Sequence, residues 1–326
     1  MVRRTFCLIV IVLAAIIGIQ CQSTSSDKKA NSGKPYIQKL GTVDCDMTET
    51  TPIVFNDRLY RFECVRDNYK PNKTGDSYFR FIDVESGKST PAFATGYHLG
   101  SAFVQNDTVF IYGVNSWGNS NIQVFWSTDL KTWFFQSALR LEGWEIFNNS
   151  VCKGPDRYIM AFEVGAPPEI VGTRFTSRFA ESHDLINWKI LPDDYVYAKD
   201  RYTACPTMKF LKGYFYMTYL ELRPGRIFDS YIVRSEDLIH WKSSPLNPVL
   251  HFSPEDKVIY NPDLTTEQRE LIANADIINN SDVDLCEFNG KVHIYYSCGN
   301  QLGIEFLAYA VYDGSLEDFL MGFFPE

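Results

Sequence analysis

Three carboxylic side chains stand near tight turns at the two ends of the chain, where acid–base chemistry could be built. Glu49 lies in "MTETTPIVFND", and Asp282 and Asp284 lie in "SDVDLCEFNG". Acid–base hydrolysis needs one carboxylate that activates the nucleophile and one protonated carboxyl group that donates to the leaving oxygen. Carboxyl groups that lie close together raise one another's pKa, as a general acid requires. These three residues are therefore the first candidates for a catalytic centre.

The elements that would position these side chains are five similar hairpins. Each has an apolar strand, a tight turn and a second strand rich in Tyr or Phe, and the turn residues tolerate positive φ. The copies are "TTPIVFNDRLYRFEC", "SAFVQNDTVFIYGV", "SVCKGPDRYIMAFEV", "TMKFLKGYFYMTYLE" and "DLCEFNGKVHIYYSC". Their turns recur about every 50–77 residues, a spacing typical of β-propeller blades.

This repeat predicts an all-β fold, a five-bladed β-propeller over residues 41–326. About 57 residues per blade are enough for four short strands. Long helical periodicity is confined to "TTEQRELIANADI" at 265–277. We expect a short helix there, inserted in the last blade and capped by Thr265 or Thr266.

Alignment of the five turns shows which residues open each first strand. Seven residues before the turns at 56, 106, 155, 212 and 289 stand Glu49, Leu99, Asn148, Cys205 and Asp282. Five residues before them stand Thr51, Ser101, Ser150, Thr207 and Asp284. Period-two alternation would place Asp282 and Asp284 on one side of their strand. Because the last blade adjoins the first in a closed ring, we expect Glu49 to converge with both of them at the axial mouth. Three buried acids are costly unless they bind something, which favours a function over a purely structural role.

A second repeat, Ser-x-Asp-Leu-x-x-Trp, occurs three times. The copies are "STDLKTW" at 127–133, "SHDLINW" at 182–188 and "SEDLIHW" at 235–241. Each would form the turn between the two outer strands of a blade. There the Asp suits an Asx-turn, the Ser can bond the same loop and the Trp can pack between neighbouring blades. We interpret the motif as a structural element and not as a catalytic one.

The five hairpins and the three Asp-containing turns resemble the five-bladed β-propeller glycoside hydrolases of families 43, 32, 62 and 117. The resemblance implies hydrolysis of a glycosidic bond by two carboxyl groups at the axial end. Glu49 stands where families 43 and 62 place an Asp general base. The sequence departs from family 43 at Ser101, which stands near the position of a pKa-modulating Asp. It departs again at Ala204, because the family's general-acid Glu precedes a Gly-Pro and Ala204 precedes Cys205-Pro206.

A replacement acid could come from a returning strand, whose end reaches the same axial face. Glu163 in "MAFEVG" and Glu221 in "YLELRPG" occupy such ends. The predicted catalytic set is therefore Glu49, Asp282, Asp284, Glu163 and Glu221. Sugar binding also needs aromatic platforms and charged donors. His98 opens the second blade, and family 117 is thought to use a His as its acid. The predicted substrate-binding set is His98, Trp117, Trp144, Arg201, Tyr202 and Arg223.

The N-terminal segment has the pattern of an export signal. Arg3 and Arg4 precede an apolar run at 7–19, which is short for a membrane span. We expect a signal peptide at 1–21, a polar linker at 22–40 and a secreted, cell-surface or periplasmic protein. Lipidation of Cys21 and a retained signal anchor are the alternatives. Among the cysteines that remain, Cys64 and Cys298 end second strands in the adjoining first and last blades, and a disulfide between them would close the ring.

Composition restricts the partners that the chain could have. The formal net charge of −9 argues against nucleic acid, which rewards clustered Lys and Arg. No cofactor or catalytic metal is expected, although a structural Ca²⁺ would suit oxygen ligands of this kind. We expect a monomer with a carbohydrate substrate and no membrane span in the mature chain.

The leading hypothesis is a secreted glycoside hydrolase that acts on oligosaccharides or polysaccharides. The alternative is a non-catalytic carbohydrate-binding or interaction propeller, which the missing Glu-Gly-Pro acid favours. A sialidase-like enzyme fits less well, because sialidases have six blades.

Overall fold

The structure is a computed structural model that describes residues 33–325. The predicted signal peptide at 1–21 and the linker up to residue 32 lie outside these residues. Strands dominate the part of the chain that is described. The helical segments within it are short, namely α1 (Pro168–Val171), η1 (Pro254–Lys257), α2 (Thr266–Asn274) and α3 (Leu316–Gly322).

The strands form three separate antiparallel sheets and one larger sheet. The first sheet contains β2 (Met47–Phe55), β3 (Arg58–Val65) and β4 (Tyr78–Asp83). The second contains β5 (His98–Gln105), β6 (Thr108–Val114), β7 (Asn121–Ser127) and β8 (Phe134–Arg140). The third contains β9 (Glu145–Lys153), β10 (Tyr158–Ala166), β11 (Thr176–Ser182) and β12 (Lys189–Ile190).

The larger sheet has two antiparallel parts joined by one parallel bridge between Phe228 and Asn279. Its first part contains β13 (Thr203–Leu211), β14 (Tyr214–Arg223), β15 (Ile227–Ser235) and β16 (Trp241–Ser243). Its second part contains β17 (Asn279–Phe288), β18 (Lys291–Gly299), β19 (Glu305–Asp313) and, at its outer edge, β1 (Gln38–Cys45). Helix α2 lies between β16 and β17 in the chain and begins at an N-cap, Thr265, whose hydroxyl accepts the N–H of Gln268.

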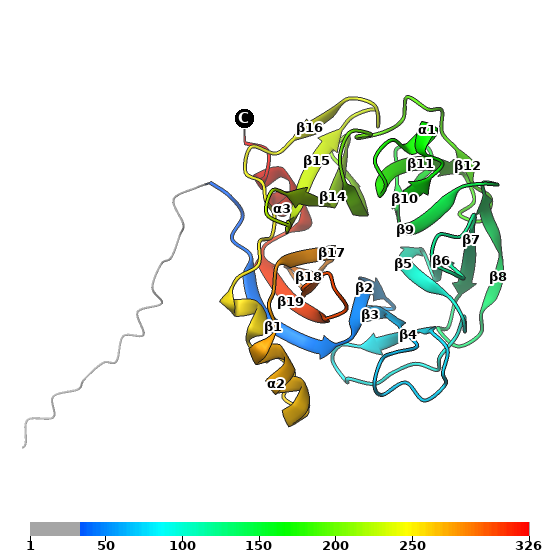
Figure 1. The fold of residues 1–326 in the computed structure, drawn as a ribbon. Helices are drawn as coiled ribbons and strands as arrows, with labels where there is room; N and C mark the ends of the chain where they lie inside the picture. Colours follow the sequence, from blue (N-terminus) through cyan, green and yellow to red (C-terminus); the bar gives the residue numbers. More distant parts are fainter. Residues whose placement is uncertain (1–32, 326) are drawn as a thin grey trace, which may run out of the picture. The chain divides into compact units, whose positions relative to one another are not determined.

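The five predicted hairpins are confirmed, because β2/β3, β5/β6, β9/β10, β13/β14 and β17/β18 all pair antiparallel. The first strands of these hairpins pack against one another in cyclic order. β2 contacts β5, β5 contacts β9, β9 contacts β13, β13 contacts β17, and β17 contacts β2. Figure 1 shows β2, β5, β9 and β17 around a common centre, with β8 and β16 towards the outside. The start of each first strand therefore faces the same axis.

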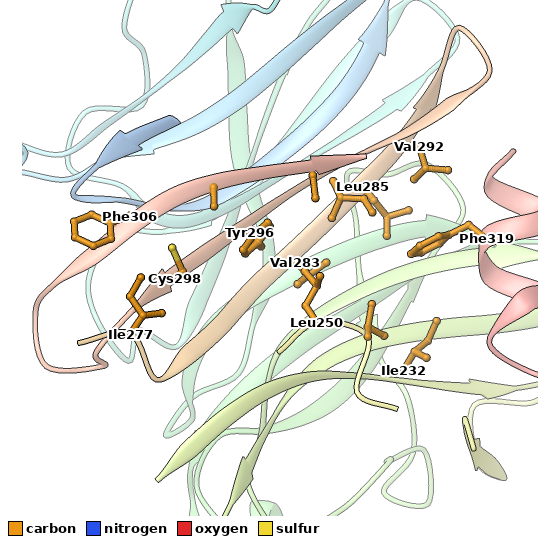
Figure 2. Close-up of a cluster of buried hydrophobic side chains, with 14 of the residues drawn as sticks. Ile232, Leu250, Ile277, Val283, Leu285, Val292, Tyr296, Cys298, Phe306 and Phe319 are labelled. Atoms are coloured by element: carbon orange, nitrogen blue, oxygen red, sulfur yellow. The ribbon is translucent and has the colours of Figure 1, made fainter. Parts of the chain in front are cut away.

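The ring is closed by strand pairing. β1 pairs antiparallel with β19, so that the first and last strands of the described chain lie side by side. β1 begins at Gln38, within the segment expected to be a linker. The predicted disulfide was wrong, since Cys64 and Cys298 are both buried free thiols. Figure 2 shows Cys298 within an apolar cluster, where it packs as a small hydrophobic side chain.

The largest apolar cluster lies where the last sheet meets its neighbours. Side chains of β17, β18 and β19 meet Ile232 of β15 and Phe319 of α3, and Figure 2 shows how they interdigitate. Alternating apolar residues on these strands are the reason, because period-two spacing gives each strand one face to bury. This packing fixes β17, the strand that carries Asp282, relative to the axis.

The three Ser-x-Asp-Leu-x-x-Trp motifs form the same turn in three sheets. In the first copy, the Ser127 hydroxyl accepts the Leu130 N–H at 2.9 Å. Asp129 Oδ1 accepts the N–H groups of Lys131 at 2.8 Å and Thr132 at 2.7 Å. These donors hold the pKa of Asp129 at about 2. The copies at 182–188 and 235–241 repeat the bonds with nearly equal distances.

The tryptophans of these motifs pack against the preceding sheet. Trp133 stacks on Phe93 with ring centroids 3.9 Å apart, and Trp188 meets Tyr112 edge-on at 5.6 Å. Trp241 stacks on Phe179 at 5.6 Å. The structural interpretation of the motif is therefore confirmed.

Replacing one motif carboxylate should affect stability and leave the axial site unchanged. We expect Asp184→Ala to lower the free energy of unfolding by about 1 kcal/mol, because two backbone N–H groups lose their acceptor. Chemical denaturation would measure the loss. Asp194→Ala is the matched control, since Asp194 is exposed on the following loop. An Asp184 variant as stable as this control would contradict the interpretation.

Within residues 33–325, none of the helices combines the length and the apolar character needed to cross a membrane.

Candidate active site

The first strands are interrupted by β-bulges where they open towards the axis. The pairing register breaks between Thr48 and Thr51, His98 and Ser101, Ala204 and Thr207, and Ser281 and Asp284. In each interval one residue adopts left-handed backbone geometry, with φ values of 49° at Glu49, 51° at Leu99, 52° at Cys205 and 50° at Asp282. Such positions are uncommon for residues other than glycine and concentrate at functional sites.

These bulged residues meet at one cavity of about 580 Å³. All five residues that the hairpin alignment placed seven positions before the turns line it: Glu49, Leu99, Asn148, Cys205 and Asp282. The alignment therefore located the axial mouth correctly. The other polar and aromatic lining residues are Thr48, Arg66, Asp67, Asn68, His98, Trp117, Glu163, Phe175, Tyr202, Ser281, Gln301 and Glu305.

Glu49 is a carboxylate of this cavity that forms a salt bridge. Its Oε1 lies 3.1 Å from Arg66 Nη2, and its carboxylate side chain is 8% exposed. Thr48 receives a hydrogen bond from Arg66 and donates one to Glu49 Oε2. The Arg66–Thr48 pair therefore fixes the orientation of the Glu49 carboxylate at the start of β2.

Glu163 reaches the cavity from the returning strand β10. A register break between Phe162 and Val164 leaves Glu163 without a partner residue on β9. Its Oε2 accepts the Cys205 N–H at 2.7 Å and the Asn148 side-chain amide at 3.2 Å. Burial raises the pKa of Glu163 to about 7 despite these two donors. At neutral pH a fraction of Glu163 therefore carries a proton that it can donate.

Two further carboxyl groups share the cavity with raised pKa values. Burial, and next the charge of Glu49, raises the pKa of Asp282 to about 6, although the Ser281 hydroxyl donates to it at 2.7 Å. Burial and the charge of Asp282 raise the pKa of Glu305 to about 7. Within residues 33–325, Glu49 alone among these four acids forms a salt bridge.

The predicted sugar-binding residues divide between the cavity and other surfaces. His98, Trp117 and Tyr202 line the cavity. His98 Nε2 lies 3.1 Å from the Ser77 hydroxyl, and burial lowers the pKa of His98. Trp117 is 65% exposed, which leaves its ring free to stack on a ligand at the mouth.

Several predicted residues lie outside this cavity. Asp284 lines a narrow neighbouring pocket together with Glu49 and Asp282, and it pairs with Lys209 at 3.0 Å. The bulge at Asp282 separates it from the larger cavity. Glu221 is engaged by Arg201, whose Nε lies 3.4 Å from its Oε1. The structure does not bring these three residues to the cavity lining.

The remaining two predicted residues are also elsewhere. Arg223 Nη1 binds the buried Asp229 at 2.6 Å. Trp144 lines a separate groove beside Arg157 and packs over the Arg178 guanidinium, 5.6 Å from its ring centroid. Neither side chain lines the cavity: Arg223 ends β14, and Trp144 directly precedes β9.

Glu305 and Arg66 were not predicted, because neither stands at a fixed distance before a hairpin turn. Glu305 opens β19 and Arg66 directly follows β3. The signal for Arg66 is its place just after Cys64, which pairs with Thr48 beside Glu49 and so brings a cation to that carboxylate. Among residues 33–325, no group of three or more His, Cys, Asp or Glu side chains is arranged to hold a metal ion.

Comparison with known proteins identifies the fold. No protein-family model matches the sequence, and no curated protein matches it either. Solved structures do match. A glycoside hydrolase is 14% identical, with a TM-score of 0.60 over 85% of this chain and 91% of that one. An exo-1,5-α-L-arabinanase from a bovine ruminal metagenomic library is 10% identical, with a TM-score of 0.55 over 82% and 93%.

A third similar structure was solved with a bound sugar. The α-L-arabinofuranosidase of Podospora anserina, in complex with cellotriose, is 10% identical, with a TM-score of 0.54 over 87% of this chain and 99% of that one. The chain therefore has the fold of the β-propeller glycoside hydrolases, as the sequence resemblance implies.

Proposed function

We propose that this protein is a glycoside hydrolase that cleaves oligosaccharides or polysaccharides at the axial cavity. The observation that carries the proposal is a set of four carboxyl groups in one cavity, Glu49, Glu163, Asp282 and Glu305, on a scaffold shared with glycoside hydrolases; a fifth, Asp67, is exposed at its edge. One of the four is paired with arginine, and three have pKa values raised towards neutrality. Such a separation of environments is what paired acid and base roles require.

The roles follow from the contacts of each carboxyl group. Glu49, held by Arg66 and Thr48, is the general base that activates water. Glu163 is the general acid, because its raised pKa leaves it protonated near neutrality and its Oε1 is not used by the donors on Oε2. Asp282 lines the same cavity, and its negative charge helps Glu163 to keep its proton.

An assay of hydrolysis tests the proposal directly. Because two of the similar structures are arabinose-releasing enzymes by name, arabinosides belong first in a panel that also holds xylosides, galactosides and oligosaccharides. We expect the purified chain to release sugar from at least one of them and Glu49→Gln to abolish that release. No hydrolysis by wild type on a broad panel would contradict the proposal.

A non-catalytic carbohydrate-binding propeller is the second candidate. It is favoured by Ala204 on β13, which stands where the resemblance implies a general-acid Glu. Binding on a glycan array without release of product would support this function. Turnover that depends on Glu49 would exclude it.

We further propose the domain organisation and location that go with this function. The domain would span residues 41–326 as five blades, whose first strands are β2, β5, β9, β13 and β17, with α2 as an insertion in the last blade. Residues 1–21 would be a signal peptide and 22–40 a linker. The protein would then act outside the cell as a monomer. N-terminal sequencing of the exported protein, and its mass in solution, would test these statements.

A further inference from the structure

The loop that joins β3 to β4 forms one wall of the cavity. It spans residues 66–77, and its first three residues all line the cavity. At one end of the loop, Arg66 binds the Glu49 carboxylate at 3.1 Å. At the other end, the Ser77 hydroxyl lies 3.1 Å from Nε2 of His98. Both ends of the loop therefore contact a side chain of the candidate active site.

One side chain in the middle of the loop ties these two ends together. The Asn72 amide nitrogen donates to the carbonyl oxygen of Arg66 at 2.9 Å and to that of Asp76 at 2.8 Å. Its Oδ1 accepts the N–H of Thr74 at 2.9 Å and lies 2.7 Å from the hydroxyl of the same residue. Asn72 thus uses both donors and both acceptor positions of its side chain within the loop.

These contacts restrict which residue can stand at position 72. Aspartate would keep the acceptor contacts to Thr74 but has no donor for either carbonyl group. Serine has a single donor, and glutamine is longer by one methylene. Asparagine therefore has the donors, the acceptors and the length that this bridge requires.

The other contacts of the loop do not join its two ends. The pairing of β3 with β4 stops at Val65 and Tyr78, so the loop beyond it depends on its own hydrogen bonds. The Tyr69 N–H donates to the Arg66 carbonyl at 3.2 Å, which supports one end alone. The Tyr69 hydroxyl donates to Asp44 of β1 at 2.8 Å and anchors the outer part of the loop.

We propose that Asn72 is a positioning residue of the candidate active site, which holds both ends of the β3–β4 loop so that Arg66 meets Glu49 and Ser77 meets His98. Its effect on catalysis rests on the proposed hydrolase function. Asn72 does not line the cavity, so it acts through the residues that do. The bond to Arg66 connects it to the general base, and the bond to Asp76 connects it to the neighbour of Ser77.

The kinetic test compares Asn72→Ala with Asn72→Asp. Alanine removes every side-chain contact, whereas aspartate removes the two donors alone. We expect both variants to lose about tenfold in kcat/KM, because small displacements of the groups that hold a catalytic residue are costly.

Asn261→Ala is the matched control for these variants. Asn261 is also a loop asparagine, which donates to the Val43 carbonyl and accepts the Asp263 N–H, but it lies outside the cavity. It should lose comparable stability and keep its activity. An Asn72→Asp variant as active as wild type, or a loss equal to that of Asn261→Ala, would overturn the proposal.

A second readout does not depend on catalysis. Burial lowers the pKa of His98, and the charges that act on it are those of Asp67, Glu49 and Arg66. Burial is the largest of these influences, so a loop released by Asn72→Ala should admit water to the imidazole and raise the pKa of His98. NMR titration of the His98 ring proton would measure the rise, and Asn261→Ala should show none.

The two readouts separate this inference from the proposed function. An unchanged His98 titration in Asn72→Ala would overturn the inference even if the enzyme is active. If wild type hydrolyses no glycoside, the proposed function fails, and the titration still decides whether Asn72 holds the loop against His98.

Discussion

Glu163→Gln is expected to reduce glycoside hydrolysis by about 10²–10⁴-fold, the contribution typical of a positioned general acid. Glutamine keeps the side-chain volume and can still accept the Cys205 N–H and the Asn148 amide, but it has no proton to donate. The alkaline limb of the pH profile, which reports deprotonation of Glu163, should disappear with it. Steady-state kinetics on an unactivated glycoside would measure both effects.

The same variant should be more stable than wild type in alkaline solution. The folded-state pKa of Glu163 is raised from 4.5 to about 7, so the folded state binds more protons than the unfolded state between these values. Stability therefore falls as pH rises through this window, and the cost reaches about 3 kcal/mol above it. Glu163→Gln removes this cost. Thermal melting at pH 8 and pH 4 should show a gain at the higher pH alone.

Together, these outcomes separate catalysis from folding. Glu181→Gln is the matched control, because Glu181 lies on the neighbouring strand β11 and binds Arg157 outside the cavity. It should leave activity unchanged and show no alkaline gain. Full activity in Glu163→Gln would remove Glu163 from the mechanism, and destabilisation at pH 8 would contradict its raised pKa.

Asp256→Ala should destabilise the fold by about 3–5 kcal/mol, because it leaves a buried cation without its partner. Asp256 is fully buried and binds Lys39 of β1 at 2.8 Å. The Tyr296 hydroxyl at 2.7 Å and the Asn280 amide at 3.1 Å donate to the same carboxylate. Segment η1 thereby ties β1 to β17 and β18, beside the β1–β19 pairing that closes the ring.

Chemical denaturation would measure this loss. Asp263→Ala is the control, since Asp263 is an exposed residue shortly after η1. Lys39→Met in the Asp256→Ala background should recover part of the loss, because the unpaired buried cation is then removed. Equal stability of the Asp256 and Asp263 variants would show that ring closure does not depend on the buried ion pair.

The positions of Glu49 and Asp282 could be predicted because their signals are local. Turn residues such as Asn56 and Asn289 mark the hairpins. The residue that stands seven positions before each turn lies at the axial mouth. Glu163 could be predicted as well, because the end of the second strand of a hairpin reaches the same axial face as the start of the first. The pairing of β1 with β19 could not be predicted in this way, because the two strands are separated by nearly the whole chain and neither carries a local signal for the other.

The placements of Asp284 and Glu305 depend on more than a count along one strand. Period-two alternation assumes an unbroken strand, and the bulge at Asp282 interrupts it, so that Asp284 pairs with Lys209 beside a narrow pocket that Glu49 and Asp282 also line. Glu305 belongs to β19, which has no turn of fixed length before it. Where several strands bring side chains together, tertiary packing decides which side chains meet. Counting residues from a turn in one sequence does not reveal these contacts.

The bulged positions also bear on how such a site could change over time or by design. Glutamate, leucine, cysteine and aspartate occupy the same backbone geometry at Glu49, Leu99, Cys205 and Asp282. A residue set apart from the pairing ladder makes its contacts through its side chain, so each of these four positions can serve a different purpose on one backbone shape. Leu99, the apolar member, is buried in a core cluster as well as lining the cavity, so a polar side chain there would change the cavity wall and lower stability together.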